Sequence, residues 1–277
     1  MTSHAEYQNL LQFGIFRDEQ EIEHFSTTRA GGVSKGEFSS LNLGNFSDDD
    51  PLCIVENRQI LARMFCQSVS DFVIPHQTHG SKILLIDQSF LSLNIADKTE
   101  ALYGVDACLT REKDLFLCVT TADCVPVILF DKSKKVIASI HAGWRGTVAR
   151  IVEKTIGEMR RIYDSSPKDI VAGIGPAICL KNFEVGDEVV AEFKRNDFDL
   201  TDEKVSSCST LTGKTHLNLP EINRRELLRL GVPESQIETA EYCTFDHPDL
   251  FFSARRQSVH SGRMLTGIKI KTKQKAE

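Results

Sequence analysis

Short runs of apolar residues, separated by polar and turn-forming residues, recur along the chain. Such runs predict strands, and a nearly continuous apolar run predicts a strand that is covered on both faces. Two lysines and a serine at 132–134 separate two of the runs and predict a hairpin between them. The predicted strands lie at residues 82–87, 105–109, 115–120, 125–131, 135–140 and 264–271.

A helical period follows the predicted hairpin. Across residues 147–163, apolar side chains recur at i, i+3 and i+4, and charged side chains lie largely on the opposite face. This pattern predicts one amphipathic helix over 147–163. Two more helices are predicted at 186–196 and 220–230, the second with Pro220 in its first turn.

No repeat, low-complexity tract or linker rich in proline and glycine divides these elements. The acidic run at 47–51 is typical of a solvated turn, and the basic run at 271–275 is typical of a frayed tail. We therefore expect one domain of mixed α/β type over residues 1–277.

The composition narrows the class of protein. The 277 residues are 41% hydrophobic and 26% charged, which favours a folded globular chain over a disordered one. The net charge of -6 argues against a nucleic acid or an anionic membrane as partner, because both select excess positive charge. No secretory leader is visible, and no apolar run reaches the roughly 20 residues that span a bilayer. We expect a cytoplasmic protein, either a monomer or a homodimer.

The eight cysteines are spread along the chain and form no C-x-x-C pair. In a cytoplasmic protein such thiols are reduced, and a cysteine is most often a small buried hydrophobe. We expect most of the eight to lie in the core.

Residues 136–147 carry the most informative motif. An apolar strand ends at Ile140, His141 follows, and a Gly-Trp-Arg-Gly turn leads into the predicted helix. Backbone N–H groups at the start of a helix attract anions, so this turn suits phosphate, with Arg145 as a bidentate partner. An ordinary strand-to-helix turn with Arg145 on the surface fits the pattern equally well.

Two further motifs lie at predicted strand ends. Polar residues interrupt the apolar pattern across 118–126, and buried polar groups are costly unless they are paired or used. The predicted hairpin brings Cys124 from this segment to the same sheet edge as His141. The loop at 75–80 holds two histidines, the second being His79, and suits a metal or proton-transfer role.

Together, His79, Cys124 and His141 offer the two imidazoles and one thiolate of a catalytic zinc site, which keeps a fourth position open. Their spacing is not that of a compact zinc motif. Taken singly, each is more typical of a packed or surface residue than of a ligand, so the residues alone leave both interpretations open.

The chain resembles the YfiH-like family, once labelled a laccase-like multicopper polyphenol oxidase and later a purine nucleoside phosphorylase. Its segments occur in family order and cover nearly the whole chain. They are "HFSTTRAGGVSKGEFSSLNLG" at 24–44, "VENR" at 55–58, "HQTHG" at 76–80, "TTADCVPVILFD" at 120–131, "IHAGWRGTVARIV" at 140–152, "GIGPAICLKNFEVGDEV" at 173–189, and "FFSARR" and "SGR" within 251–263.

The resemblance implies a zinc site formed by His79, Cys124 and His141, which match the family's positions. Copper is a further candidate in vitro, because copper(II) outranks zinc in intrinsic affinity. The resemblance also implies a polar cleft whose contacts to substrate include Arg29, Asn42, Asp123, Arg145 and Arg255.

The fold implied by the resemblance is a layered α/β sandwich, with central mixed sheets packed between helices, similar to the Cys–His deamidase domain of cytotoxic necrotizing toxins. The implied activity is phosphorolysis of adenosine, inosine, guanosine and 5'-methylthioadenosine, with adenosine deamination at the same site. Inorganic phosphate is then a substrate, which Arg145 and Arg29 would bind. Asp123 would transfer protons in deamination.

Three alternatives stay open from the sequence. Cys124 as a nucleophile with His141 as base would make a metal-independent hydrolase or deamidase, acting on cell-wall precursors. A nucleoside-binding module would bind without turnover. A laccase-like copper oxidase has little support, because the chain has only eight histidines and no His-x-His pair.

Overall fold

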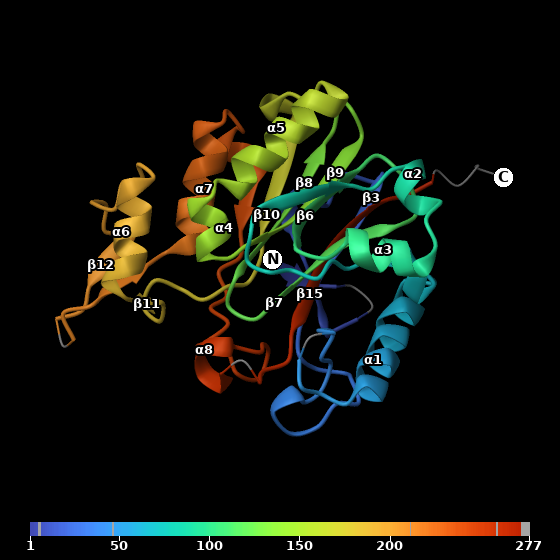
Figure 1. Cartoon of the computed structure of the whole chain (residues 1–277), viewed down its shortest axis with the longest axis horizontal. Coiled ribbons are helices and arrows are strands. Elements are labelled where there is room, and N and C mark those ends of the chain that lie inside the picture. The colour runs from blue at the N-terminus through green and yellow to red at the C-terminus, as the bar shows by residue number, and fades with distance from the viewer. Residues whose placement is uncertain (5–6, 46, 211, 259, 273–277) are drawn as a thin grey trace.

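Two six-stranded sheets form the centre of the molecule (Figure 1). The structure is a computed structural model that describes residues 1–4, 7–45, 47–210, 212–258 and 260–272. The first sheet runs in the order β1 (Thr2–Ser3), β2 (Leu10–Gln12), β3 (Ile22–Thr27), β15 (Met264–Ile270), β7 (Phe116–Thr121) and β4 (Phe72–Val73). The second runs in the order β14 (Ile237–Thr239), β10 (Ile170–Ile174), β8 (Val125–Asp131), β9 (Val136–Ala142), β6 (Val105–Thr110) and β5 (Lys82–Leu85).

Both large sheets are mixed, because each contains parallel and antiparallel pairs. A small third sheet has the order β11 (Glu184–Val185), β13 (Thr215–Leu217) and β12 (Ser206–Cys208). The α-helices are α1 (Pro51–Met64), α2 (Gln88–Leu91), α3 (Ile95–Ala101), α4 (Trp144–Val148), α5 (Ile151–Tyr163), α6 (Asp187–Arg195), α7 (Leu219–Arg229) and α8 (Ala254–Gln257). Short 3-10 helices occur at Gly14–Phe16, Gly36–Phe38, Val69–Asp71, Pro167–Asp169 and Glu234–Gln236.

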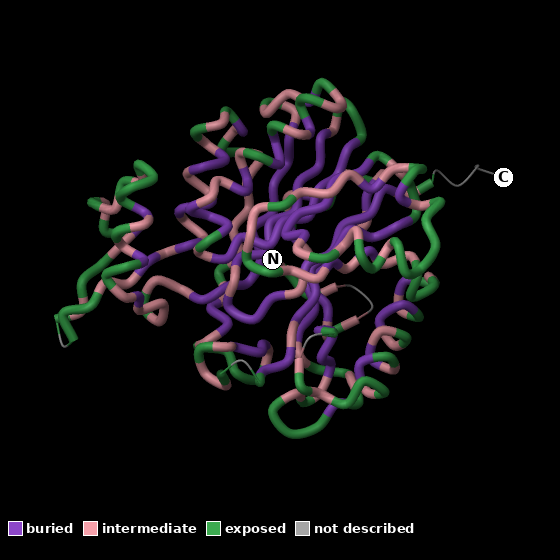
Figure 2. The backbone as a smooth tube through the Cα atoms, viewed as in Figure 1, coloured by how far each residue is buried: buried purple, intermediate pink, exposed green. Residues whose placement is uncertain are grey.

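The two large sheets pack face to face between layers of helices. Side chains alternate along a strand, so β8 contributes to two cores. Val127 and Leu129 pack with buried side chains of α5 and α7, whereas Ile128 and Phe130 pack toward the first sheet with Ile268. On the outer face of the first sheet, Leu61 of α1 joins a third apolar cluster that includes strand residues of β3 and β7. The buried backbone therefore follows the strands (Figure 2).

The predicted strands are confirmed to within two residues at each end, and the hairpin at 132–134 joins antiparallel β8 and β9. The predicted helices at 186–196 and 220–230 correspond to α6 and α7. This architecture is the mixed α/β arrangement of sheets and helices that the sequence predicted. Within the described residues, none of the helices combines the length and the apolar character needed to cross a bilayer.

The prediction of a single helix over 147–163 is wrong. The chain forms α4 and α5, and Arg150 between them has a left-handed backbone with φ 59°. The Arg150 guanidinium donates to Glu226 Oε2 at 2.6 Å and to the Asn196 carbonyl at 2.9 Å, and it stacks on Phe198. These contacts offset the cost of the left-handed backbone, a cost that the apolar pattern does not reveal.

Two smaller expectations need adjustment. The turn predicted at 47–51 ends at Asp50, whose side chain caps α1 by accepting the Leu52 N–H at 2.9 Å. Helix α1 itself was not predicted from the pattern. In the predicted tail at 271–275, residues 273–275 lie outside the described part of the chain.

The expectation that most cysteines lie in the core is wrong. Only Cys108, Cys118 and Cys243 are buried. The others are half-buried or exposed, namely Cys53, Cys66, Cys124, Cys179 and Cys208.

Candidate functional site: a His2Cys cluster on a polar cleft

The β8–β9 hairpin places Cys124 and His141 next to each other. Pro126 pairs with His141 and Val125 with Ala142, so Cys124 immediately precedes Val125, the first residue of β8. The chain turns sharply before it, since Asp123 has φ 90°. The sequence prediction that both side chains meet at one sheet edge is confirmed.

His79 comes from the loop between β4 and β5. Its backbone is left-handed, with φ 61°, which is uncommon for a residue with a side chain. The buried Asp106 carboxylate of β6 holds the loop in this shape. It accepts the N–H groups of Thr78 at 3.3 Å, His79 at 3.0 Å and Gly80 at 2.7 Å.

Asp106 also orients His141. Its Oδ1 lies 2.8 Å from His141 Nδ1. This bond places the Nδ1 proton toward the carboxylate, so Nε2 is the ring nitrogen left for a metal or a reacting group. Sequence reasoning missed Asp106. The signal was a lone carboxylate inside the apolar run at 105–109, where burial demands partners.

His79, Cys124 and His141 form the group that we call the hairpin cluster. Their donor atoms all lie within 4.8 Å of one another, and the two imidazole centroids are 4.9 Å apart. The neighbouring Gly143 leaves room for them. A β-carbon there would lie 3.2 Å from both Cys124 Sγ and His79 Cδ2. The cluster is therefore close enough to hold one metal ion.

The electrostatics of the cluster favour a thiolate. Burial of Cys124 acts to raise its pKa, but the charge of His141 and hydrogen bonds from both histidines outweigh it and lower the pKa. Burial acts to lower the pKa of His141, whereas the Cys124 thiolate and Asp106 raise it. A thiolate is the form of cysteine that binds metals and attacks electrophiles.

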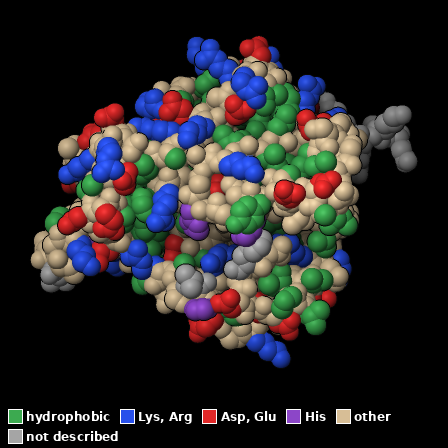
Figure 3. Space-filling model, viewed as in Figure 1, with side chains coloured by type: hydrophobic (Ala, Val, Ile, Leu, Met, Phe, Trp, Pro, Cys, Tyr) green, Lys and Arg blue, Asp and Glu red, His purple; other side chains and the backbone are tan. Residues whose placement is uncertain are grey.

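The hairpin cluster lies on a cleft of about 480 Å³. In the view of Figure 3, histidine side chains reach the surface near the centre of the molecule, with Lys and Arg side chains around them. Trp144, Ile178 and Phe183 give the cleft an apolar side, and Thr120, Thr121 and Arg263 give it a polar one. Such a mixture suits a small ligand with an aromatic and a polar part.

Two of the other predicted site residues line this cleft. Asp123 is buried, and its carboxylate accepts from Thr244 Oγ1 at 2.6 Å, Ser253 Oγ at 3.0 Å and the Arg255 N–H at 2.6 Å. Arg255 is exposed, and its guanidinium lies 5.4 Å from the Phe183 ring centroid. Asp123 thus ties the loop before α8 to the hairpin.

The structure places Arg29, Asn42 and Arg145 outside the lining of the cleft. Arg29 donates to the carbonyls of Ser39 at 2.7 Å and Pro248 at 2.9 Å. Asn42 is fully buried, and its Oδ1 accepts the Arg263 N–H at 2.9 Å. Arg145 is exposed and stacks on Trp144. Contacts from these three residues to a substrate stay predictions.

Arg263 lines the cleft and was not singled out by sequence reasoning, although it lies in the "SGR" segment. Burial lowers the pKa of its guanidinium, and the charges of Cys124 and Asp123 act against this. Its Nη1 donates to Ser261 Oγ at 2.8 Å and to the Gly262 carbonyl at 3.0 Å. The cleft therefore contains a fixed positive charge near the hairpin cluster.

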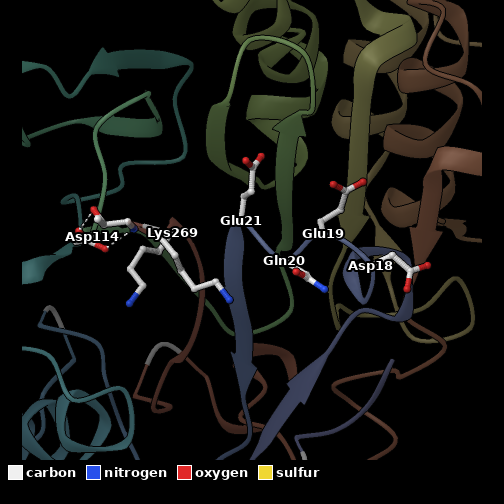
Figure 4. A pocket seen from close by; sticks show the side chains of 8 residues that line it. Asp18, Glu19, Gln20, Glu21, Asp114 and Lys269 are labelled. Carbon is white, nitrogen blue, oxygen red and sulfur yellow. Dashed lines mark hydrogen bonds between the residues drawn. The ribbon is translucent and has the colours of Figure 1, made fainter. Parts of the chain in front are cut away.

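A larger hollow of about 900 Å³ shares no lining residue with this cleft. Figure 4 shows the side chains of Asp18, Glu19, Glu21, Asp114 and Lys269 around it. No histidine or cysteine is among the described residues that line it. It lacks the groups for nucleophilic or soft-metal chemistry, so the smaller cleft is the candidate site.

The fold and the site together define a class of protein: a layered α/β domain with a His2Cys cluster at its strand ends. Residues 23–271 match the model of the family described as "Multi-copper polyphenol oxidoreductase laccase". The chain belongs to this family, and the predicted membership of the YfiH-like family is confirmed.

Two relatives and one solved structure are similar to this chain over almost its whole length. A Bacteroides thetaiotaomicron protein named purine nucleoside phosphorylase is 44% identical over 270 residues, 98% of this chain and 99% of its own. Adenosine deaminase RL5, from an unknown prokaryotic organism, is 41% identical over 247 residues, 89% of this chain and 93% of its own. The crystal structure of the Bacillus licheniformis hypothetical protein YfiH has a TM-score of 0.84 and 30% identity, covering 96% of this chain and all of that one.

Proposed function

We propose that this protein is a zinc-dependent purine nucleoside phosphorylase. Its substrates would be adenosine, inosine, guanosine and 5'-methylthioadenosine, and adenosine would also be deaminated. The observation that carries the proposal is the hairpin cluster, with its donors within 4.8 Å, on a cleft of about 480 Å³. The names of the two relatives, one a phosphorylase and one a deaminase, support the same pair of reactions.

The donor set fits zinc. Two imidazoles and one thiolate are typical ligands of a catalytic zinc ion, and Gly143 leaves the space beside them open. Bound zinc would supply a Lewis acid and lower the pKa of a coordinated water. The one proton that the Cys124–His141 pair holds besides His141 Nδ1–H would leave on metal binding, because only the neutral imidazole and the thiolate are ligands.

The other residues of the cleft have roles that follow from their contacts. Asp106 holds the His141 ring and the His79 loop, so it is a positioning residue. The aromatic rings of Trp144 and Phe183 would take the purine. Arg255 and Arg263 line the cleft and would bind phosphate, and contacts from Arg29 and Arg145 to phosphate stay predictions.

Asp123 is proposed as the group that transfers protons during deamination. It lies on the cleft, but both its oxygens already accept hydrogen bonds from Thr244, Ser253 and Arg255. Its first effect is therefore to hold the cleft wall in place. Asp123→Asn with adenosine separates the roles. Loss of inosine formation with unchanged phosphorolysis supports proton transfer, and equal loss of both supports positioning.

A product assay tests the proposal. Purified protein of measured metal content is incubated with adenosine, with and without phosphate. We expect adenine and ribose 1-phosphate with phosphate, and inosine without it. A His141→Ala protein that has lost zinc but retains full activity toward adenosine with phosphate would overturn the zinc-dependent reaction. The absence of all three products would overturn the proposed activity itself.

A Cys–His hydrolase or deamidase acting on cell-wall precursors is the second candidate. One observation favours it: Asp106, His141 and Cys124 are linked in series, as in nucleophile–base–carboxylate triads. The predicted likeness to toxin deamidases belongs to this candidate. Turnover by metal-free protein, abolished when Cys124 is alkylated, would select it over the metalloenzyme.

Copper calls for a separate measurement. Copper(II) binds nitrogen and sulfur ligands more tightly than zinc does, so we expect it to compete for the hairpin cluster in vitro. A laccase-like oxidase would also need phenol oxidation by the copper-loaded protein. Turnover of adenosine by zinc-loaded protein, with no phenol oxidation by either the zinc-loaded or the copper-loaded form, argues for the phosphorylase.

A further inference from the structure

A second group of soft donors lies apart from the hairpin cluster. It consists of Cys179, Cys243 and Asp246, which we call the turn cluster. Its three donor atoms also lie within 4.8 Å of one another. Cys243 is buried, Cys179 is half-buried and Asp246 is exposed, so the group sits at the surface with one side open.

Two similar turns build the turn cluster. One contains Cys179 and Asn182, and the Asn182 N–H donates to the Cys179 carbonyl at 3.0 Å. The other contains Cys243 and Asp246, and the N–H of the following residue, His247, donates to the Cys243 carbonyl at 3.2 Å. Each turn has the pattern Cys-x-x-Asn/Asp and presents a sulfur and a side-chain oxygen group. Many zinc sites assemble four ligands from two turns of the pattern Cys-x-x-Cys, and these two turns have the same spacing with Asn or Asp at the second position.

The hydrogen bonds of the turn cluster are unbalanced. The two N–H groups of the Asn182 amide face three acceptors: Cys179 Sγ at 3.3 Å, Cys243 Sγ at 3.3 Å and Asp246 Oδ1 at 2.8 Å. The Cys179 thiol also makes a long side-chain contact within the cluster, to Asp246 Oδ2 at 3.8 Å. Electron-rich atoms thus converge on one point that a single N–H2 group occupies. The Cys179 backbone N–H donates to Cys243 Sγ at 3.2 Å, a contact that strengthens when sulfur becomes a thiolate.

We propose that the turn cluster is a second metal site, which binds a soft divalent cation such as zinc through Cys179 Sγ, Cys243 Sγ and an Asp246 carboxylate oxygen. Rotation of the Asn182 amide would bring its oxygen toward the ion as a fourth ligand. Each thiol releases its proton to solvent as the metal–sulfur bond forms, and no electron is transferred. The guanidinium of Arg256, which donates to the Thr244 carbonyl at 3.2 Å and the Phe245 carbonyl at 2.6 Å, lies behind the second turn and offsets the added negative charge.

The turn cluster is structural in this proposal, and it supports one wall of the cleft. Ile178 precedes Cys179, and its N–H donates to the Asp123 carbonyl at 3.0 Å. Thr244 follows Cys243, and its hydroxyl donates to the Asp123 carboxylate. A bridging ion would therefore fix the two segments that hold Asp123. The inference does not depend on which reaction the cleft performs.

Cobalt(II) in a Cys124→Ser protein tests the proposal, because this variant removes the only sulfur of the hairpin cluster. We expect apo protein titrated with cobalt chloride to develop thiolate-to-cobalt charge-transfer absorption at one equivalent, and added zinc chloride to abolish it. The absorption should vanish in Cys124→Ser/Cys179→Ser and Cys124→Ser/Cys243→Ser. It should persist in the matched control Cys124→Ser/Cys208→Ser, since Cys208 is exposed and outside the turn cluster.

A second readout covers the case in which a variant folds poorly. Zinc should raise the melting temperature of Cys124→Ser protein by several degrees and leave that of Cys124→Ser/Asp246→Ala unchanged or raise it much less. No cobalt–thiolate absorption in folded Cys124→Ser protein would overturn the proposal. So would a mass lower by two hydrogen atoms, with both sulfurs resistant to alkylation, because the pair would then be a disulfide.

Discussion

The hairpin cluster takes His141 from β9 and Cys124 from the residue next to its partner strand β8, whereas the turn cluster takes all of its donors from turns. The strand ladder and the buried Asp106 fix the first set before any ligand arrives. In the second set, the backbones of the two segments are paired by one isolated β-bridge, between Ala177 and Cys243. A rigid scaffold suits chemistry, which needs fixed geometry, while a set of turns suits an ion that draws its own ligands together.

The largest expected effect comes from removing a donor of the hairpin cluster. We expect Cys124→Ser to lower turnover of adenosine by more than about 100-fold. Mutation of a residue that only hydrogen-bonds to a metal ligand already lowers metal affinity or activity by about 10–100-fold, and Cys124 would be a ligand itself. Steady-state kinetics and metal content measure this. Cys208→Ser is the matched control, and its turnover should stay within about twofold. Full activity of a Cys124→Ser protein would contradict the central place of this cluster.

Asp106→Asn should have the next largest effect. The amide cannot accept from both the His141 ring and the three loop N–H groups, so we expect about a 10–100-fold loss of zinc affinity or activity. Competition with a chromogenic chelator measures the affinity. Asp131→Asn is the control, because Asp131 is equally buried in the second sheet but belongs to the turn of the hairpin. Equal affinity losses in both variants would mean that Asp106 acts only through general stability.

Alkylation of metal-free protein compares the two clusters directly. The pKa of Cys124 is lowered by its histidines, whereas burial and the neighbouring Cys243 raise the pKa of Cys179 to about 11. The thiolate fraction grows as pH rises through the pKa, so Cys124 should react with iodoacetamide near pH 7 and Cys179 only at alkaline pH. Peptide mass spectrometry should give at least about a tenfold difference in rate at pH 7. Equal rates at that pH would mean that the two sulfurs have the same environment.

Gly143→Ala should have the smallest effect. Its backbone has φ -68°, which any residue adopts, so the variant should fold. The new methyl group would lie 3.2 Å from Cys124 Sγ and His79 Cδ2, and we expect zinc affinity to fall several-fold. Gly157→Ala in α5 is the control, because nothing lies within 4 Å of its added carbon and helix propensity favours it by about 1 kcal/mol. Unchanged affinity in Gly143→Ala would show that the cluster relaxes more freely than its strands suggest.

The sequence predicted the parts of the site that follow from short-range patterns. Apolar runs around 132–134 identified the hairpin, and the hairpin brought Cys124 and His141 together. His79 was a candidate from its own loop motif, but the residues alone left its grouping with the other two open until the family resemblance implied it, since its loop is distant in the chain. Asp106 was missed because its partners are backbone N–H groups of that loop, and no periodicity records them.

Other features depended on long-range contacts. The break between α4 and α5 follows from the anchoring of Arg150 by Glu226 of α7, which the apolar period of 147–163 does not register. The turn cluster was missed because Cys179 and Cys243 are 64 residues apart, and each was expected to be an ordinary core cysteine. Only the crossing of the two turns gives them a shared environment.

The turn that joins β8 to β9 lies at the far end of the hairpin from the site, because the two strands are long. Seven paired positions run from Val125–Ala142 at the cluster end to Asp131–Val136 at the other end, where Ser133 and Lys134 of the turn are exposed. New chain ends opened between these two residues would leave both flanking strands in register. The hairpin tip is therefore a suitable place for circular permutation, for an inserted reporter domain or for immobilising the protein on a support.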